Sequence, residues 1–237
     1  MKAISRTNRG LVRENNEDSV LVQVPHLFAI ADGMGGEKAG EVASFEAVKL
    51  LSGLDLSKVK DDDVLCKLEE KIKNINSCIW NMWHKDGTLK GMGTTLTAVY
   101  MNDLDRAFVG HVGDSRIYLM QDEILKQVTS DHSYVAELVR QKKITQKEAD
   151  SSTNKHFIMR AVGAEEDVVI DLFEFLIAGA QKLLLCSDGL SNMVPHDEMQ
   201  KILTKKDLNE IADDLMNLAL KAGGKDNISF IVLDLEG

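Results

Sequence analysis

Hydrophobic residues recur every three or four positions in two segments, and this spacing predicts two amphipathic helices. The first segment spans residues 38–52 and the second spans residues 61–84. The apolar positions of the second segment are Leu65, Leu68, Ile72, Ile75, Ile79 and Met82. Such a stripe normally packs against a sheet, so packing is favoured over the alternative of a partner-binding groove.

Shorter apolar runs bounded by turn residues predict strands. Residues 20–24 alternate between valine and more exposed positions, and a buried run over residues 27–31 stops at Asp32. Later strands are expected at 94–101, 106–112, 116–120, 124–128, 167–175, 182–187 and 228–235. The four between residues 94 and 128 are joined by short turns, which implies antiparallel pairing because parallel strands need long crossovers.

Helices are expected between these blocks of strands, and this order indicates the class of fold. One or two polar helices are predicted over residues 133–150, and others over 196–204 and 207–222, whereas residues 151–158 are irregular. Blocks of consecutive strands separated by helices are typical of an α+β layered fold rather than a doubly wound parallel sheet. Because the chain has two prolines and no glycine- or serine-rich tract, we expect residues 1–237 to form a single domain.

Composition and charge narrow the class of partner. The chain is 44% hydrophobic and 28% charged, with a net charge of −10. This balance argues against a surface for nucleic acid or anionic membrane, both of which need clustered cations. It does not exclude phosphate chemistry, because bound metal ions reverse the local sign of charge.

The compartment follows from the cysteines and from the absence of targeting signals. The three cysteines have no CxxC spacing, which predicts neither a disulfide framework nor a thiolate metal site. The N-terminus lacks the apolar stretch of a signal peptide, and no apolar run approaches the about 20 residues that span a bilayer. We therefore expect a cytoplasmic protein without membrane insertion, and a monomer, since no apolar stripe demands a second copy.

Acidic residues with small neighbours stand where strands are predicted to begin or end. An isolated Asp-Gly pair is an ordinary turn, so no single instance is informative. Several on separate segments indicate a site for hard cations such as Mg²⁺ and Mn²⁺, which prefer oxygen ligands. Nearby Arg13 suits a two-point contact with phosphate. The acidic signatures are Asn15-Asn16-Glu17-Asp18, Ala31-Asp32-Gly33-Met34-Gly35-Gly36, Gly113-Asp114-Ser115-Arg116, Ser187-Asp188-Gly189 and Asp226-Asn227.

Other chemistries lack their sequence signatures. The chain has no GxSxG elbow, no P-loop lysine motif and no HExxH. The run of glycines at 33–36 does not have the GxGxxG spacing of a dinucleotide loop. His111, His132 and His156 are isolated, and each is expected to be structural or at the surface rather than catalytic. If a water is activated between two metal ions, that water is the nucleophile, and the reaction needs no nucleophilic side chain.

These signatures, in this order, resemble those of metal-dependent Ser/Thr protein phosphatases of type 2C, in particular the compact bacterial branch. The resemblance extends from about residue 6 to the C-terminus and also includes Arg13-Glu14, Gly93-Thr94-Thr95 and Gly110-His111-Val112. It implies two antiparallel β-sheets packed as a sandwich with helices on both outer faces (α-β-β-α). It also implies hydrolysis of phosphoserine and phosphothreonine by direct attack of a hydroxide that bridges two Mn²⁺ or Mg²⁺ ions.

The resemblance assigns metal ligands to five residues. Asp32 would bridge the two ions, and the carbonyl of Gly33 would help to bind one of them. Asp188 and Asp226 would complete the ligands of the other ion. Asp114, together with Asp188, would hold a third, weaker ion.

Other roles follow from the same resemblance. Arg13 would orient the substrate phosphate, so that Arg13, Asp32 and Asp188 are the expected catalytic residues. Glu17 and Asp18 would hold metal-bound waters, and Asn227 would lie near the site. The expected partners are phosphorylated proteins, including a Ser/Thr kinase of eukaryotic type whose action this protein would reverse.

The chain departs from the family pattern at two places. Glu37 stands where bacterial members often carry a histidine, and it is the candidate general acid if its pKa is raised. The flap at about 131–162 has Ser151-Ser152-Thr153 where a His-Pro pair is common. The alternative function, a weak or inactive relative that only binds phosphoproteins, would be marked by loss of a metal carboxylate. None of the three main metal aspartates is missing.

Overall fold

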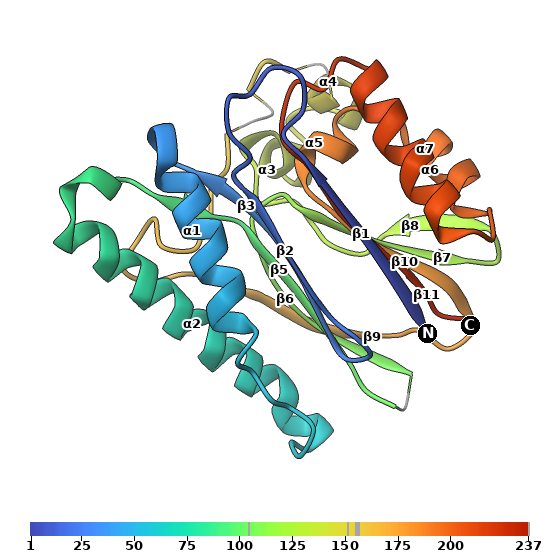
Figure 1. The fold of residues 1–237 in the computed structure, drawn as a ribbon, viewed down its shortest axis with the longest axis horizontal. Helices are drawn as coiled ribbons and strands as arrows, with labels where there is room; N and C mark the ends of the chain where they lie inside the picture. Colours follow the sequence, from blue (N-terminus) through green and yellow to red (C-terminus); the bar gives the residue numbers. More distant parts are fainter. Residues whose placement is uncertain (104, 151, 155–156, 237) are drawn as a thin grey trace.

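Two antiparallel sheets pack face to face in the computed structural model, which describes residues 1–103, 105–150, 152–154 and 157–236 (Figure 1). The first sheet has the strand order β1 (Lys2–Asn8), β11 (Ile228–Asp234), β10 (Ala180–Cys186), β7 (Arg116–Gln121) and β8 (Ile124–Gln127). The second has the order β2 (Asp18–Gln23), β3 (Leu27–Met34), β5 (Leu96–Met101), β6 (Arg106–Val112) and β9 (Asp171–Leu176), and β4 (Gly93–Thr94) pairs with β3.

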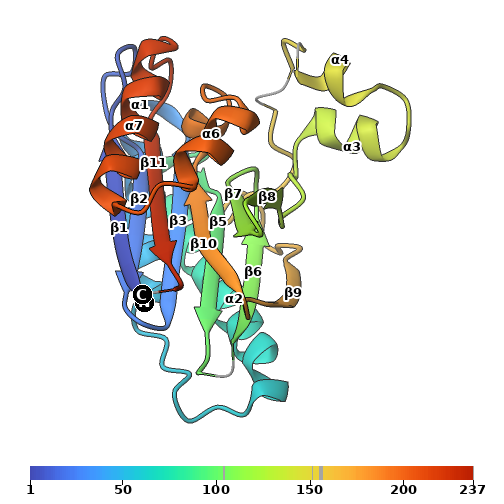
Figure 2. The same cartoon turned by 90° about the vertical axis from the view of Figure 1, so that its right-hand side faces the viewer.

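Helices cover the outer face of each sheet, which confirms the expected α-β-β-α sandwich (Figures 1 and 2). The second sheet is covered by α1 (Gly36–Leu51) and α2 (Asp61–Lys85), which is followed by the short 3₁₀ helix η1 (Gly87–Leu89). The first sheet is covered by α6 (His196–Leu203) and α7 (Leu208–Lys221), with α5 (Asp188–Ser191) directly after β10. In Figure 2, α3 (Tyr134–Arg140) and α4 (Gln146–Asp150) project away from the sandwich.

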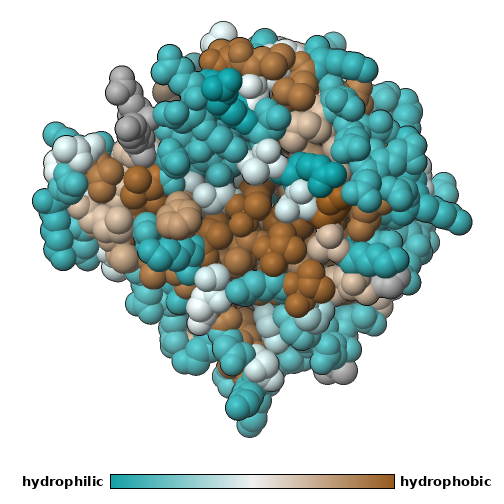
Figure 3. Space-filling model, in the orientation of Figure 1, coloured by the Kyte–Doolittle hydropathy of each residue, from teal (hydrophilic) through white to brown (hydrophobic). Residues whose placement is uncertain are grey.

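Apolar side chains form three layers that hold these elements together. One lies between the sheets, and one lies between each sheet and its helices. The predicted stripe of α2 is buried on the second sheet, where Gly110 of β6 lets the helix approach closely. A Cβ on Gly110 would lie 2.4 Å from Cδ1 of Ile72. Hydrophilic residues cover most of the face drawn in Figure 3, and hydrophobic residues form a band across its centre.

Several boundaries predicted from the sequence are wrong. Strand β1 was not predicted, although it pairs with β11 over its whole length. Strand β3 does not stop at Asp32 but continues to Met34, since these residues still pair with β2 and β4. The strand predicted at 167–175 begins only at Asp171. The polar segment 133–150 forms two helices, and Ser151 and His156 lie outside the described residues.

Candidate active site

A cleft of about 990 Å³ opens at one end of the sandwich. Antiparallel pairing brings the start of β2, β7 and β11 to the same end as the finish of β3, β6 and β10, so residues far apart in sequence meet there. Most residues proposed from the sequence line this cleft: Arg13, Glu17, Asp32, Gly33, Asp114, Asp188, Asp226 and Asn227.

Asp18 and Asp32 lie opposite each other on β2 and β3. Asp18 is only 8% exposed, and its Oδ2 accepts a hydrogen bond from Oγ of Ser187 at 2.8 Å. Its Oδ1 is buried and has no hydrogen-bond partner among the described residues. Burial raises the pKa of Asp18 to about 7, and repulsion from Asp188 and Asp226 adds to the effect.

The pKa of Asp32 is also raised well above its usual value, first by burial and then by repulsion from Asp18 and Asp188. The position of Asp32 is fixed through its backbone, because its N–H donates to Oγ1 of Thr95 at 2.9 Å and its carbonyl accepts from the Thr95 N–H at 2.8 Å. A carboxylate held in this way among others favours a cation beside it.

Gly33 follows Asp32 in a very narrow space. A Cβ there would lie 2.0 Å from the carbonyl oxygen of Gly40 in α1 and 2.7 Å from that of Glu17. The Gly33 N–H donates to the Glu17 carbonyl at 3.0 Å. The absence of a side chain therefore lets α1 and the start of β2 pack against the end of β3. Burial raises the pKa of the Glu17 carboxyl, which faces the cleft beside this contact.

Asn227, just before β11, contacts both the β1–β2 loop and α5. The sequence predicted only that it would lie near the site. Its Oδ1 accepts from the N–H of Glu17 at 2.8 Å, and its Nδ2 donates to the carbonyls of Arg9 at 3.0 Å and Asn15 at 2.8 Å. Gly189 packs on the same residue, since a Cβ there would lie 1.9 Å from the Asn227 carbonyl oxygen. Asn227 thus joins the β1–β2 loop to α5.

Arg13 lies at the rim of the cleft and pairs with Asp226. Its Nη2 is 2.8 Å from Oδ2 of Asp226, and this hydrogen bond raises the pKa of the guanidinium. The Arg13 side chain is 54% exposed. A charged fork at the mouth of an acidic cleft suits a phosphate that enters from solvent.

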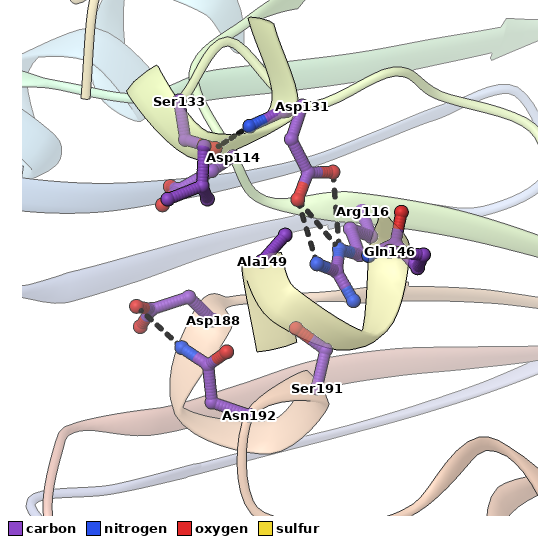
Figure 4. A pocket seen from close by; sticks show the side chains of 11 residues that line it. Asp114, Arg116, Asp131, Ser133, Gln146, Ala149, Asp188, Ser191 and Asn192 are labelled. Carbon is purple, nitrogen blue, oxygen red and sulfur yellow. Dashed lines mark hydrogen bonds and ion pairs between the residues drawn. The ribbon is translucent and has the colours of Figure 1, made fainter. Parts of the chain in front are cut away.

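Asp114 and Asp188 also line a smaller cavity of about 160 Å³ beside the cleft (Figure 4). Asp188 accepts a hydrogen bond from Nδ2 of Asn192 at 2.9 Å. Oδ1 of Asp114 is buried without a hydrogen-bond partner among the described residues, and burial raises the pKa of its carboxyl, with repulsion from Asp188 next in size. On another wall of the cavity Asp131 binds the guanidinium of Arg116 through contacts of 2.6 and 3.0 Å.

The sequence signals missed several supporting residues, namely Ser187, Thr95 and Asn192. They are common polar residues whose role depends on three-dimensional neighbours, although Ser187 and Thr95 do lie inside the quoted motifs. Glu37 is in the first turn of α1, but its side chain lies outside what the structure describes.

The donor set fits hard cations. It consists of carboxylates, two of them with a buried oxygen that lacks a hydrogen bond, and metal ions would offset the repulsion that raises their pKa values. Among the described residues, no three His, Cys, Asp or Glu side chains form a ready-made metal cluster. Mg²⁺ usually keeps several waters and binds through one or two carboxylates, which is compatible with this donor set.

The family model for protein phosphatase 2C matches residues 7–229. This chain belongs to the protein phosphatase 2C family. The phosphatase is 39% identical to the serine/threonine phosphatase stp of Listeria monocytogenes, over 99% of this chain and 96% of that one. It is 40% identical to the serine/threonine protein phosphatase PstP of Mycobacterium tuberculosis, over 99% of this chain and 45% of the relative.

Solved structures agree with this assignment. The crystal structure of the Mycobacterium tuberculosis phosphatase PstP/Ppp superposes with a TM-score of 0.93 at 41% identity, covering 100% of this chain and 99% of that one. The PstP catalytic domain in complex with two manganese ions gives a TM-score of 0.89 at 40% identity, covering 98% and 97% of the two chains. No helix in the described part of this phosphatase combines the length and apolarity needed to cross a membrane.

Proposed function

We propose that this chain is a metal-dependent Ser/Thr phosphoprotein phosphatase that uses Mn²⁺ or Mg²⁺. The observation that carries the proposal is the set of buried, mutually repelling carboxylates around Asp32, with Arg13 at the mouth of the same cleft. We further propose that residues 1–237 form one catalytic domain whose flap spans about 131–162.

The proposed roles divide between holding cations and holding substrate. Asp32, the Gly33 carbonyl, Asp188 and Asp226 would hold two ions, and Asp114 with Asp188 would hold a third. When bound, the ions would supply Lewis acidity and lower the pKa of a water to near neutrality, which provides a nucleophile.

The remaining groups would act on substrate and solvent. Arg13 would exchange its bond to Asp226 for the substrate phosphate and orient it for in-line attack. Glu17 and Asp18 would accept hydrogen bonds from ordered waters, and Asn227 keeps the Glu17 backbone in place. Glu37 remains the candidate proton donor to the leaving alkoxide.

The activity test compares p-nitrophenyl phosphate with a phosphothreonine peptide, each in Mn²⁺ and in EDTA. We expect activity in Mn²⁺, its loss in EDTA, and a loss of at least about 100-fold in Asp32→Ala or Asp188→Ala, since each change removes a metal ligand. The matched control is Asp197→Ala on α6, whose carboxylate is 92% exposed and which is not among the residues that line the cleft. Full activity in EDTA, or in either Asp32→Ala or Asp188→Ala, would refute the proposal.

Glu37 needs a separate comparison. Glu37→Gln should slow hydrolysis of a phosphoserine peptide more than that of p-nitrophenyl phosphate, because only the alkoxide leaving group requires a proton. Equal losses on both substrates would remove Glu37 from this role.

The proposed substrates include an autophosphorylated Ser/Thr kinase, and the protein is proposed to act in the cytoplasm as a monomer. Support for phosphorylated protein substrates comes from the relatives named as Ser/Thr phosphatases. Loss of phosphate from such a kinase on incubation, followed by mass spectrometry, tests the first point. Light scattering coupled to gel filtration tests the second.

A further inference from the structure

His132 lies directly behind the turn that carries Asp114. Its side chain is fully buried, and it satisfies both backbone groups of Gly113, the residue before Asp114. The His132 N–H donates to the Gly113 carbonyl at 2.8 Å, and its ring Nδ1 accepts from the Gly113 N–H at 3.1 Å. The backbone of Gly113, which leads directly into Asp114, is therefore hydrogen-bonded to His132 through both its N–H and its carbonyl.

The turn has little freedom to adopt another position. Gly113 has φ of +113°, in the region that favours glycine, and a Cβ on it would lie 2.5 Å from Cγ2 of Thr95. Three residues after Gly113, Arg116 is bound by Asp131, the neighbour of His132 in sequence. The Asp114 turn is thus held against Thr95, between β4 and β5, on one side and by residues 131 and 132 on the other.

The hydrogen bonds of His132 also determine its tautomer. Because Nδ1 accepts from a backbone N–H, the ring proton is on Nε2, which lies 3.1 Å from Oδ2 of Asp171 at the start of β9. Burial lowers the pKa of His132, which favours the neutral ring that this arrangement needs. Nη1 of Arg160 donates to the other oxygen of Asp171 at 2.8 Å and lies 3.1 Å from Nε2 of His132, so the guanidinium and the imidazole share Asp171 as their acceptor.

We infer that Asp171 and His132 are positioning residues for the Asp114 carboxylate, acting in series through the backbone of Gly113. Asp171 orients the imidazole, the imidazole fixes Gly113, and Gly113 directs Asp114 into the space that it shares with Asp188. Residues behind a metal ligand usually change metal affinity by about 10- to 100-fold when they are removed. The inference rests on the proposed role of Asp114 at the third, weaker cation.

The test measures Mn²⁺ binding to the full chain by calorimetry and by electron paramagnetic resonance of free Mn²⁺. We expect Asp171→Ala to weaken the weakest Mn²⁺ site about tenfold and to leave the tighter sites unchanged. Asp171→Asn should fall between Asp171→Ala and wild type, since its one amide oxygen can still accept from Nε2 while its NH₂ group cannot accept from Arg160. The matched control is Glu174→Ala, a carboxylate on the same strand that pairs with Arg106 instead.

A double-mutant cycle distinguishes action through His132 from an effect carried by Arg160 alone. In His132→Asn the amide oxygen takes the place of Nδ1 and keeps the bond to Gly113, but the link to Asp171 is lost. If Asp171 acts through His132, adding Asp171→Ala to this variant does not weaken Mn²⁺ binding at the weakest site any further. Additive losses would overturn the inference.

Other outcomes are equally decisive. Unchanged weak-site affinity in Asp171→Ala, or the same loss in Glu174→Ala, would contradict the positioning role. A wild-type enzyme that is active in Mn²⁺ but binds only two ions would overturn this inference and leave the proposed phosphatase function intact. An enzyme that binds Mn²⁺ without hydrolysing phosphopeptides would instead refute the proposed function.

Discussion

Replacing Asp18 by asparagine should stabilise the metal-free protein, although it should harm the enzyme. Asp18 is buried, its pKa is raised to about 7, and one of its oxygens has no hydrogen-bond partner among the described residues. Asparagine has nearly the same shape, and its oxygen still accepts from Ser187. The substitution therefore removes an unfavourable buried charge without leaving a cavity.

The size of the effect follows from the shift in pKa. The usual pKa of an aspartate is about 3.9, so a rise to about 7 spans about 3 pH units, at about 1.4 kcal/mol per unit. Between these two values the folded carboxyl holds a proton that the unfolded one has released, so stability falls as the pH rises from about 4 to about 7. We expect Asp18→Asn to be about 4 kcal/mol more stable than wild type at pH 8 in EDTA, and only about 1–2 kcal/mol more stable at pH 5.

Urea unfolding at both pH values measures this difference, with fluorescence of Trp80 and Trp83 on α2 as the signal. Saturating Mn²⁺ should reduce or reverse the advantage, because the wild type binds cations more tightly and gains more from them. Asp197→Asn is the exposed control and should match the wild type. An Asp18→Asn protein that is less stable than wild type at pH 8 in EDTA, or an advantage that is equal at both pH values, would refute the reasoning.

Three further changes test the packing and the cleft. Gly189→Ala should lower the free energy of unfolding in urea by at least about 3 kcal/mol and weaken Mn²⁺ binding, because the new Cβ would lie 1.9 Å from the Asn227 carbonyl oxygen. The control Gly87→Ala places its Cβ where nothing lies within 4 Å and should be within about 0.5 kcal/mol of wild type. Similar values for the two variants would contradict the packing argument. Arg13→Ala should lower kcat/KM on a phosphothreonine peptide by about 10- to 100-fold, through loss of a charged hydrogen bond to phosphate, and unchanged steady-state kinetics would exclude that contact. Ile72→Ala should lower the free energy of unfolding by about 2–5 kcal/mol, and a loss below about 1 kcal/mol would mean that α2 is not tightly packed on its sheet.

The sequence was most informative where one local signal determines one local structure. The structure confirms the stripe of α2 and the strands from 94 to 128. The expected antiparallel pairing is found for β5 with β6 and for β7 with β8, but β6 and β7 lie in different sheets. Strand β1 was missed because its residues alternate weakly, and its pairing with β11 depends on residues more than 200 positions away. Asp32 lies within β3 rather than after it, since the pairing of Asp18 opposite it extends the strand.

In the site, too, local motifs were predictable from the sequence and contacts between distant residues were not. The carboxylates expected from the motifs do meet in one cleft, whereas the way they are held was not predictable. Asn227 contacts Arg9, Asn15 and Glu17, and no spacing in the sequence indicates such contacts. His132 was expected to be structural or at the surface, and the structure shows it buried and hydrogen-bonded behind Asp114.

The pairing of β1 with β11 places the two ends of the described chain next to each other, as the N and C marks show in Figure 1. The cleft therefore combines residues from near the start of β2, such as Arg13, with residues just before β11, such as Asp226. Completion of the cleft depends on the pairing of β1 with β11, so folding must close a loop of more than 200 residues before Arg13 and Asp226 can meet.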